Sequence, residues 1–162
     1  MKKISCIFVI LLLFTNLIGC NLRNYQYMNF SVKPNNHYYI DEIKNKILNN
    51  KKFTLYVFDT NLYKEIEVPA DENSIFEDFI SSLTDENYSE ESVNTKEPFR
   101  LRLYFNDEDQ YFIKVFNNSI ISIAPWDGIF KEDMISIKNL PLRYNLFDFC
   151  NHIANKPIAK QN

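Results

Sequence analysis

The sequence predicts an α+β fold, in which one antiparallel sheet of about six strands has helices packed on one of its faces. Two observations lead to this prediction. Strand-like segments follow one another with short turns between them, which favours antiparallel pairing. The strands also do not alternate one by one with helices, as they would in a parallel sheet. The expected order is helix, two strands, helix, four strands, helix (α-ββ-α-ββββ-α).

Three segments have the apolar periodicity of amphipathic helices. In the second of them, Ser74 and Glu77 have the spacing of a capping box, in which each side chain bonds to the other residue's backbone N–H. In the third, Pro141 occupies a position that the first turn of a helix tolerates. The predicted helices cover 38–49, 74–83 and 141–154.

Strands are predicted from the alternation of apolar and polar side chains and from aromatic and β-branched residues. The clearest alternation is over 99–105. Its Phe and Leu side chains alternate with Arg100, Arg102 and Tyr104, which predicts one buried and one open face. The polar, acidic stretch 84–97 is expected to be an exposed loop. The predicted strands are 53–58, 63–68, 99–105, 110–116, 120–124 and 134–137.

The N-terminus has the features of a secretory signal. Two lysines precede the run 4–13, which is apolar apart from one serine and far shorter than the roughly 20 residues that span a bilayer. Leu17-Ile18-Gly19-Cys20 follows, with the small Gly19 immediately before the cysteine. These four residues resemble the lipobox of bacterial lipoproteins. The resemblance implies that residues 1–19 are cleaved and that Cys20 carries a lipid.

The lipobox resemblance implies a protein anchored by lipid to the extracytoplasmic face of a bacterial cell membrane. Residues 20–36 are then the lipidated cysteine and a tether, 37–156 a single α+β domain, and 157–162 a tail. Heavy use of Asn, Lys, Ile, Tyr and Phe is typical of translation from an AT-rich genome. The chain therefore resembles uncharacterised small lipoproteins of clostridium-like, low-GC Gram-positive bacteria.

The charge of the chain limits its partners. Removal of the two signal lysines changes the formal net charge from −3 to −5, and no long basic run occurs. Nucleic acid is therefore not an expected partner. We expect contact with the membrane through the lipid on Cys20, an unknown protein or envelope partner, and a monomeric chain.

Motifs for common chemistry are missing from the sequence. His37 and His152 are the only histidines and have no Cys or carboxylate at ligand spacing, so no metal site is predicted. Cys150 lies in the apolar stripe of the last helix, which indicates a buried side chain rather than a nucleophile. Gly128 is the only glycine after the signal, so glycine-rich phosphate loops are excluded. We predict no catalytic residue and no cofactor.

Two features indicate candidate partner-binding surfaces. Trp126 is the only tryptophan and lies among turn residues, and tryptophan is enriched at interaction hot spots. The alternative is that it folds back over the edge of the sheet. The second feature is a basic, aromatic strand face, suited to an acidic partner. Its alternative is an ordinary solvated face, or one covered by the first helix. This face would contain Arg100, Arg102 and Tyr104, together with Lys114.

The leading hypothesis is a lipid-anchored extracytoplasmic binding or accessory protein. One alternative is a small cell-envelope hydrolase that uses carboxylates such as Asp127 or Glu132 beside Trp126. Another is an inhibitor or immunity-type lipoprotein, which the sequence does not distinguish from the leading hypothesis.

Overall fold

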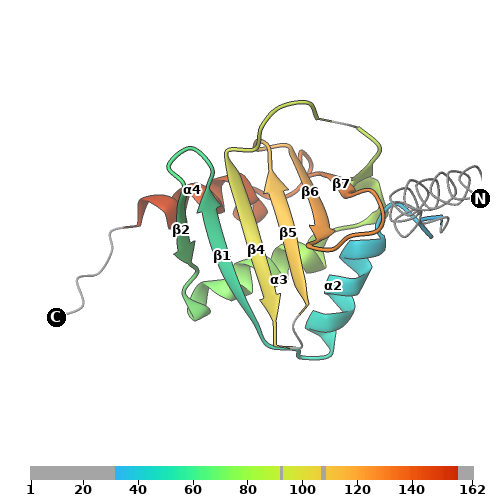
Figure 1. The fold of residues 1–162 in the computed structure, drawn as a ribbon, viewed down its shortest axis with the longest axis horizontal. Helices are drawn as coiled ribbons and strands as arrows, with labels where there is room; N and C mark the ends of the chain where they lie inside the picture. Colours follow the sequence, from blue (N-terminus) through green and yellow to red (C-terminus); the bar gives the residue numbers. More distant parts are fainter. Residues whose placement is uncertain (1–31, 92, 107–108, 157–162) are drawn as a thin grey trace, which may run out of the picture. The chain divides into compact units, whose positions relative to one another are not determined.

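A computed structural model describes residues 32–91, 93–106 and 109–156 (Figure 1). Cys20, the predicted signal and the tail 157–162 lie outside the described residues. The chain divides into two units, Met1–Val32 and Lys33–Asn162. Every helix and strand described here belongs to the second unit, which begins at Lys33, four residues before the expected start of the domain at 37.

The α+β prediction is confirmed, but the antiparallel sheet has seven strands instead of about six. The strands are β1 (Phe53–Asp59), β2 (Lys64–Glu67), β3 (Tyr88–Ser89), β4 (Phe99–Phe105), β5 (Gln110–Val115), β6 (Ile120–Pro125) and β7 (Asp133–Ser136). Their order across the sheet is β2-β1-β4-β5-β6-β7-β3.

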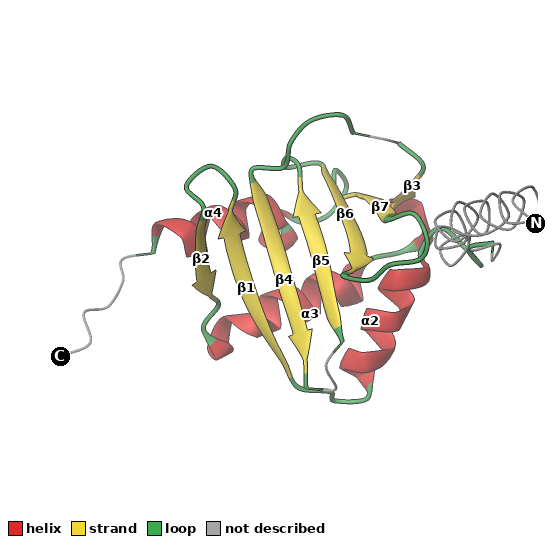
Figure 2. Ribbon diagram, in the orientation of Figure 1, coloured by secondary structure: helices red, strands yellow, loops and turns green. Residues whose placement is uncertain are grey.

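Three α-helices pack on one side of this sheet, as Figure 2 shows. They are α2 (Tyr38–Leu48), α3 (Asn73–Ser82) and α4 (Leu146–Asn155). Their apolar stripes meet the alternate side chains of the strands that point towards them, which gives the core the aliphatic and aromatic lining that the periodicity predicts. Fully buried members include Ile40, Ile43, Phe76, Phe79, Leu101, Leu103, Ile113, Ile121 and Cys150.

The seventh strand, β3, lies within the stretch 84–97, so the prediction of an exposed loop there is wrong. A short 3₁₀ helix, Asp85–Asn87, is closed by a capping box between Thr84 and Asn87. This turn brings Tyr88 opposite Ile135 of β7, and the amide of Asn87 donates to the carbonyl of Ser136 at 3.0 Å. A strand of two residues is too short to show an alternating pattern, which explains why the sequence does not reveal it.

Two predicted helix starts are also corrected. The N-cap of α3 is Glu72, without a side-chain hydrogen bond, so the capping box at Ser74 and Glu77 does not form. The last predicted helix is divided into a 3₁₀ turn, Leu142–Tyr144, and α4. The division occurs at Asn145, whose backbone is extended and whose side chain accepts the N–H of Phe147 at 2.9 Å, as N-cap residues do.

Candidate functional site

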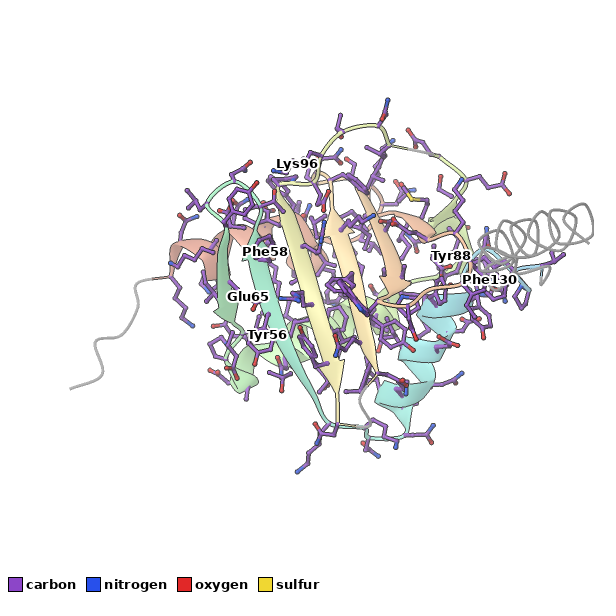
Figure 3. The ribbon with its side chains drawn as sticks, viewed as in Figure 1. Tyr56, Phe58, Glu65, Tyr88, Lys96 and Phe130 are labelled. Carbon is purple, nitrogen blue, oxygen red and sulfur yellow. The ribbon has the colours of Figure 1, made fainter. Side chains whose placement is uncertain are left out.

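The face of the sheet opposite the helices carries the predicted strand residues. Because side chains alternate along a strand, Arg100, Arg102 and Tyr104 point away from the core that their neighbours form. They lie half-buried on the uncovered side, so the alternative of a first helix covering them is wrong. Figure 3 shows Tyr56, Phe58 and Glu65 over β1 and β2. We define the open face as Tyr56, Phe58, Glu65, Arg100, Arg102, Tyr104, Phe112, Lys114 and Ser122.

An aromatic row crosses the open face from β1 to the residue after β6. The rings of Tyr56 and Tyr104 meet edge to face, with their centroids 5.6 Å apart. The guanidinium of Arg102 lies 5.8 Å from the centroid of Tyr104 and 5.5 Å from that of Phe112. Phe112 in turn packs against Trp126 at 5.1 Å. Arg102 therefore joins two groups of rings by cation–π contacts.

Each cation of the open face has a carboxylate partner. For example, Nη1 of Arg102 lies 2.6 Å from Oε1 of Glu65, which β2 supplies. The face is therefore aromatic and electrically balanced, whereas the sequence suggested a basic face. The observed charge differs from the prediction because the acidic partners come from parts of the chain outside β4 and β5. The pairs are Arg100–Glu97, Arg102–Glu65 and Lys114–Glu132.

Glu97 is the most deeply buried carboxylate of these pairs, with 8 % of its surface exposed. Burial is the largest single influence and opposes ionisation, but the hydrogen bonds from the Arg100 guanidinium, a backbone N–H and the charges of Arg100 and Lys114 together outweigh it and hold the pKa of Glu97 below its usual value. A depressed pKa means that this carboxylate stabilises the fold above its unfolded-state pKa, about 4.3. That stability is lost as the pH falls through the lower folded-state value.

The Glu97→Gln variant tests this pH dependence. We expect its free energy of unfolding to fall less steeply than that of the wild type below about pH 4.5, because the glutamine does not titrate. Urea unfolding at a series of pH values measures the difference, with Glu90→Gln as an exposed control. Parallel pH profiles for all three proteins would contradict the assignment.

Trp126 is 70 % exposed, so it does not fold back to become buried against the edge of the sheet. Its indole ring borders a cleft of about 140 Å³. A second cleft of about 230 Å³ shares four lining residues with the first. The shared residues are Asp109, Tyr111, Pro125 and Asp127.

The two carboxylates considered for hydrolysis lie at different places. Asp127 lines both clefts beside Trp126. Glu132 is instead held on the open face, where it pairs with Lys114 and accepts a hydrogen bond from the Ser122 hydroxyl. The structure therefore does not bring Asp127 and Glu132 into one cleft as an acid–base pair.

The surroundings of the two histidines and of Cys150 indicate structural roles for these residues. His37 lies 2.7 Å from Asp41 and stacks on Tyr88, while His152 is exposed near Glu72. Within residues 32–91, 93–106 and 109–156, no three His, Cys, Asp or Glu side chains are grouped so that they could hold a metal ion. Cys150 is buried as predicted, and its burial raises the pKa of the thiol, which keeps it protonated.

One ion pair with a fully buried carboxylate could not be predicted from the sequence. The carboxylate of Asp133, at the start of β7, has no exposed surface and pairs with the Lys33 ammonium. It also accepts the backbone N–H of Ile40 at 2.9 Å, which satisfies one of the unpaired donors at the N-terminus of α2. Burial raises the pKa of Asp133, although Lys33 and the N–H of Ile40 act in the opposite direction.

Comparisons with known proteins show one solved structure that is similar to this chain. The chain is similar to a crystal structure described as a "putative lipoprotein" from Clostridium perfringens, with a TM-score of 0.70 and 26% sequence identity. The match covers 77% of this chain and 100% of that chain. No curated protein matches. Of the helices in the described part of the chain, none has the length and apolar character needed to cross a membrane.

The family model described as "Domain of unknown function (DUF4883)" matches residues 33–150. This range starts at Lys33, which pairs with Asp133, and includes all seven strands, α2 and α3. The match extends over most of the chain, and the chain therefore belongs to the DUF4883 family.

Proposed function

We propose that this protein is a non-catalytic binding or accessory protein, anchored by a lipid on Cys20 to the extracytoplasmic face of the membrane. The N-terminal signal pattern and its lipobox-like end support the anchor. The similarity to a Clostridium perfringens "putative lipoprotein" over the whole of that chain supports it independently.

The aromatic row on the open face is the observation that carries the binding role. Tyr, Trp and Arg dominate the hot spots of protein–protein interfaces, and the row presents all three without a helix above them. Contact with Glu65 and with two rings holds Arg102 in place before any partner arrives, which lowers the entropy cost of binding. The partner that fits this face is a protein surface of balanced charge.

The two carboxylates considered for hydrolysis from the sequence do not form an acid–base pair, and Asp109, which lines the two clefts together with Asp127, is paired with Lys46. Asp127 and Glu132 lie in different surroundings, and Glu132 is already held by Lys114 and Ser122. Cys150 is buried in the core with a raised thiol pKa, which is the opposite of what a nucleophile needs.

A photo-crosslinking residue in place of Tyr104 tests the proposal in intact cells. We expect a discrete adduct with one envelope protein, whereas the same residue in place of Asp78, exposed on α3, gives none. Arg102→Ala should lower the yield at least roughly tenfold, because loss of a hot-spot side chain costs about 2 kcal/mol or more.

Arg143→Ala is the matched control, because Arg143 also stacks on a tyrosine, Tyr144, at 4.5 Å but lies away from the open face. With the crosslinking residue at position 104, the adduct yield of Arg143→Ala should equal that of the protein that keeps both arginines. Equal adducts from positions 104 and 78, or equal losses in the two arginine variants, would contradict binding through the open face.

A further inference from the structure

The loop between β6 and β7 adjoins the point where the chain enters the folded unit. The Lys33 ammonium donates to the carbonyl of Lys131 at 2.8 Å and pairs with Asp133, so both contacts lie at the end of this loop. Cys20 precedes Lys33 by 13 residues, which span at most about 45 Å when fully extended. A lipid on Cys20 therefore keeps this corner of the unit close to the bilayer.

The same loop exposes two large apolar side chains. Trp126 is 70 % exposed and Ile129 is 67 % exposed. The loop is held in shape on both sides of Ile129. The N–H of Trp126 donates to the carbonyl of Gln110 at 3.0 Å, and the N–H of Phe130 donates to the hydroxyl of Tyr39 at 2.8 Å.

Phe130 anchors the far end of the loop. Figure 3 shows it beside the first turn of α2, where its ring meets that of Tyr38 edge to face at 5.5 Å. Gly128 lies close to Tyr39, because a Cβ there would be 3.3 Å from the hydroxyl oxygen of Tyr39. The exposure of Trp126 and Ile129 is thus a property of a fixed surface.

The residue types suit the boundary between lipid headgroups and acyl chains. Tryptophan is enriched there, and an aliphatic side chain contributes buried apolar area. The charges of the loop do not oppose contact with an anionic surface, because Lys131 balances Asp127 and the Glu132 carboxylate is paired with Lys114.

We propose that the β6–β7 loop rests on the bilayer, with Trp126 and Ile129 inserted at the interface. This inference depends on the lipid anchor proposed above. The contact of two side chains is weak alone, but a short tether holds the loop at an effective concentration on the order of millimolar. The β6–β7 loop therefore orients the folded unit on the bilayer, while the lipid on Cys20 provides the anchoring.

Trp126 is the only tryptophan in the chain, so its fluorescence reports on this surface directly. The lipidated full-length protein is reconstituted into phosphatidylcholine–phosphatidylglycerol vesicles, with and without brominated acyl chains. We expect the emission to shift to shorter wavelength and to be quenched by the brominated lipid. We also expect the bilayer to shield Trp126 from aqueous acrylamide.

The Ile129→Asp variant should lose most of the bromolipid quenching while it still sediments with the vesicles. Leu62→Asp should behave as the wild type, because Leu62 is equally exposed but lies in the turn between β1 and β2. Unchanged circular dichroism would show that both variants are folded.

Two results would overturn the inference. If the wild type sediments with vesicles but Trp126 stays open to acrylamide and unquenched by bromolipid, the anchor stands and the loop contact is wrong. If the wild type does not sediment with vesicles, the lipid anchor fails, and the loop contact fails with it.

Discussion

Replacement of Asp133 by alanine should lower the free energy of unfolding by about 3 kcal/mol, because it breaks a buried ion pair and leaves polar groups without partners. The carboxylate is fully buried and pairs with Lys33, whose side chain is largely covered. The N–H of Ile40 would also lose its acceptor at 2.9 Å. The N-cap residue of α2, His37, has no side-chain hydrogen bond to take over that role.

Urea unfolding measures this loss, and two further variants separate its causes. Asp133→Asn keeps an oxygen that can accept the N–H of Ile40, so it should lose less stability than the alanine variant. Asp78→Ala removes an exposed carboxylate of α3 and should stay within about 0.5 kcal/mol of the wild type. If Asp133→Ala unfolds at the same urea concentration as Asp78→Ala, the ion pair does not stabilise the fold.

The pH dependence of Asp133 runs opposite to that of Glu97. Because the folded-state pKa of Asp133 is raised, ionisation of its carboxyl opposes folding: the stability linked to its proton is fully present below the unfolded value of about 3.9 and is lost as the pH rises through the folded value. Glu97 has a lowered pKa and loses its contribution on acidification. Acid destabilisation should therefore follow Glu97, not the more deeply buried Asp133.

Patterns within single segments could be predicted from the sequence because they arise from local periodicity. The alternation over 99–105 correctly placed Arg100, Arg102 and Tyr104 on one face of β4. The apolar stripe of the last helix correctly predicted that Cys150 is buried. In these cases each residue's environment follows from its neighbours two to four positions away.

Features that depend on distant pairing could not be predicted in the same way. Lys33 and Asp133 are separated by 100 residues, and no local pattern connects them. The partner of Arg102, Glu65, becomes visible only when the register of β2, β1 and β4 is known. The charge balance of the open face is therefore a property of the sheet, and strand β4 considered alone predicts an excess of positive charge that the face does not have.

The aromatic row and the β6–β7 loop share one residue, Trp126. Its ring packs on Phe112 of the open face, while its backbone begins the loop that we place on the bilayer. If both proposals hold, the open face stands next to the membrane surface. A protein that binds Tyr104 and Arg102 would then be held close to the lipid headgroups, which favours a partner that is itself anchored in the membrane.

Replacement of Cys20 by alanine should move nearly all of the protein from the membrane pellet to the culture medium. Burial of lipid chains contributes about 0.8 kcal/mol per CH₂ group, and two or more chains anchor a protein stably. Without the thiol no lipid can be attached. The remaining contact through Trp126 and Ile129 is too small to retain the protein, because it no longer benefits from a tether.

Incorporation of a labelled fatty acid gives the matching measurement. The wild type and Cys150→Ala should both carry the label and sediment with membranes, because the thiol of Cys150 is buried in the core. Cys20→Ala should do neither. A Cys20→Ala protein that stays in the pellet would show that something other than lipid holds it there. The loop variant Ile129→Asp separates the two contributions, because it should remain in the pellet with its lipid while its orientation on the bilayer is lost.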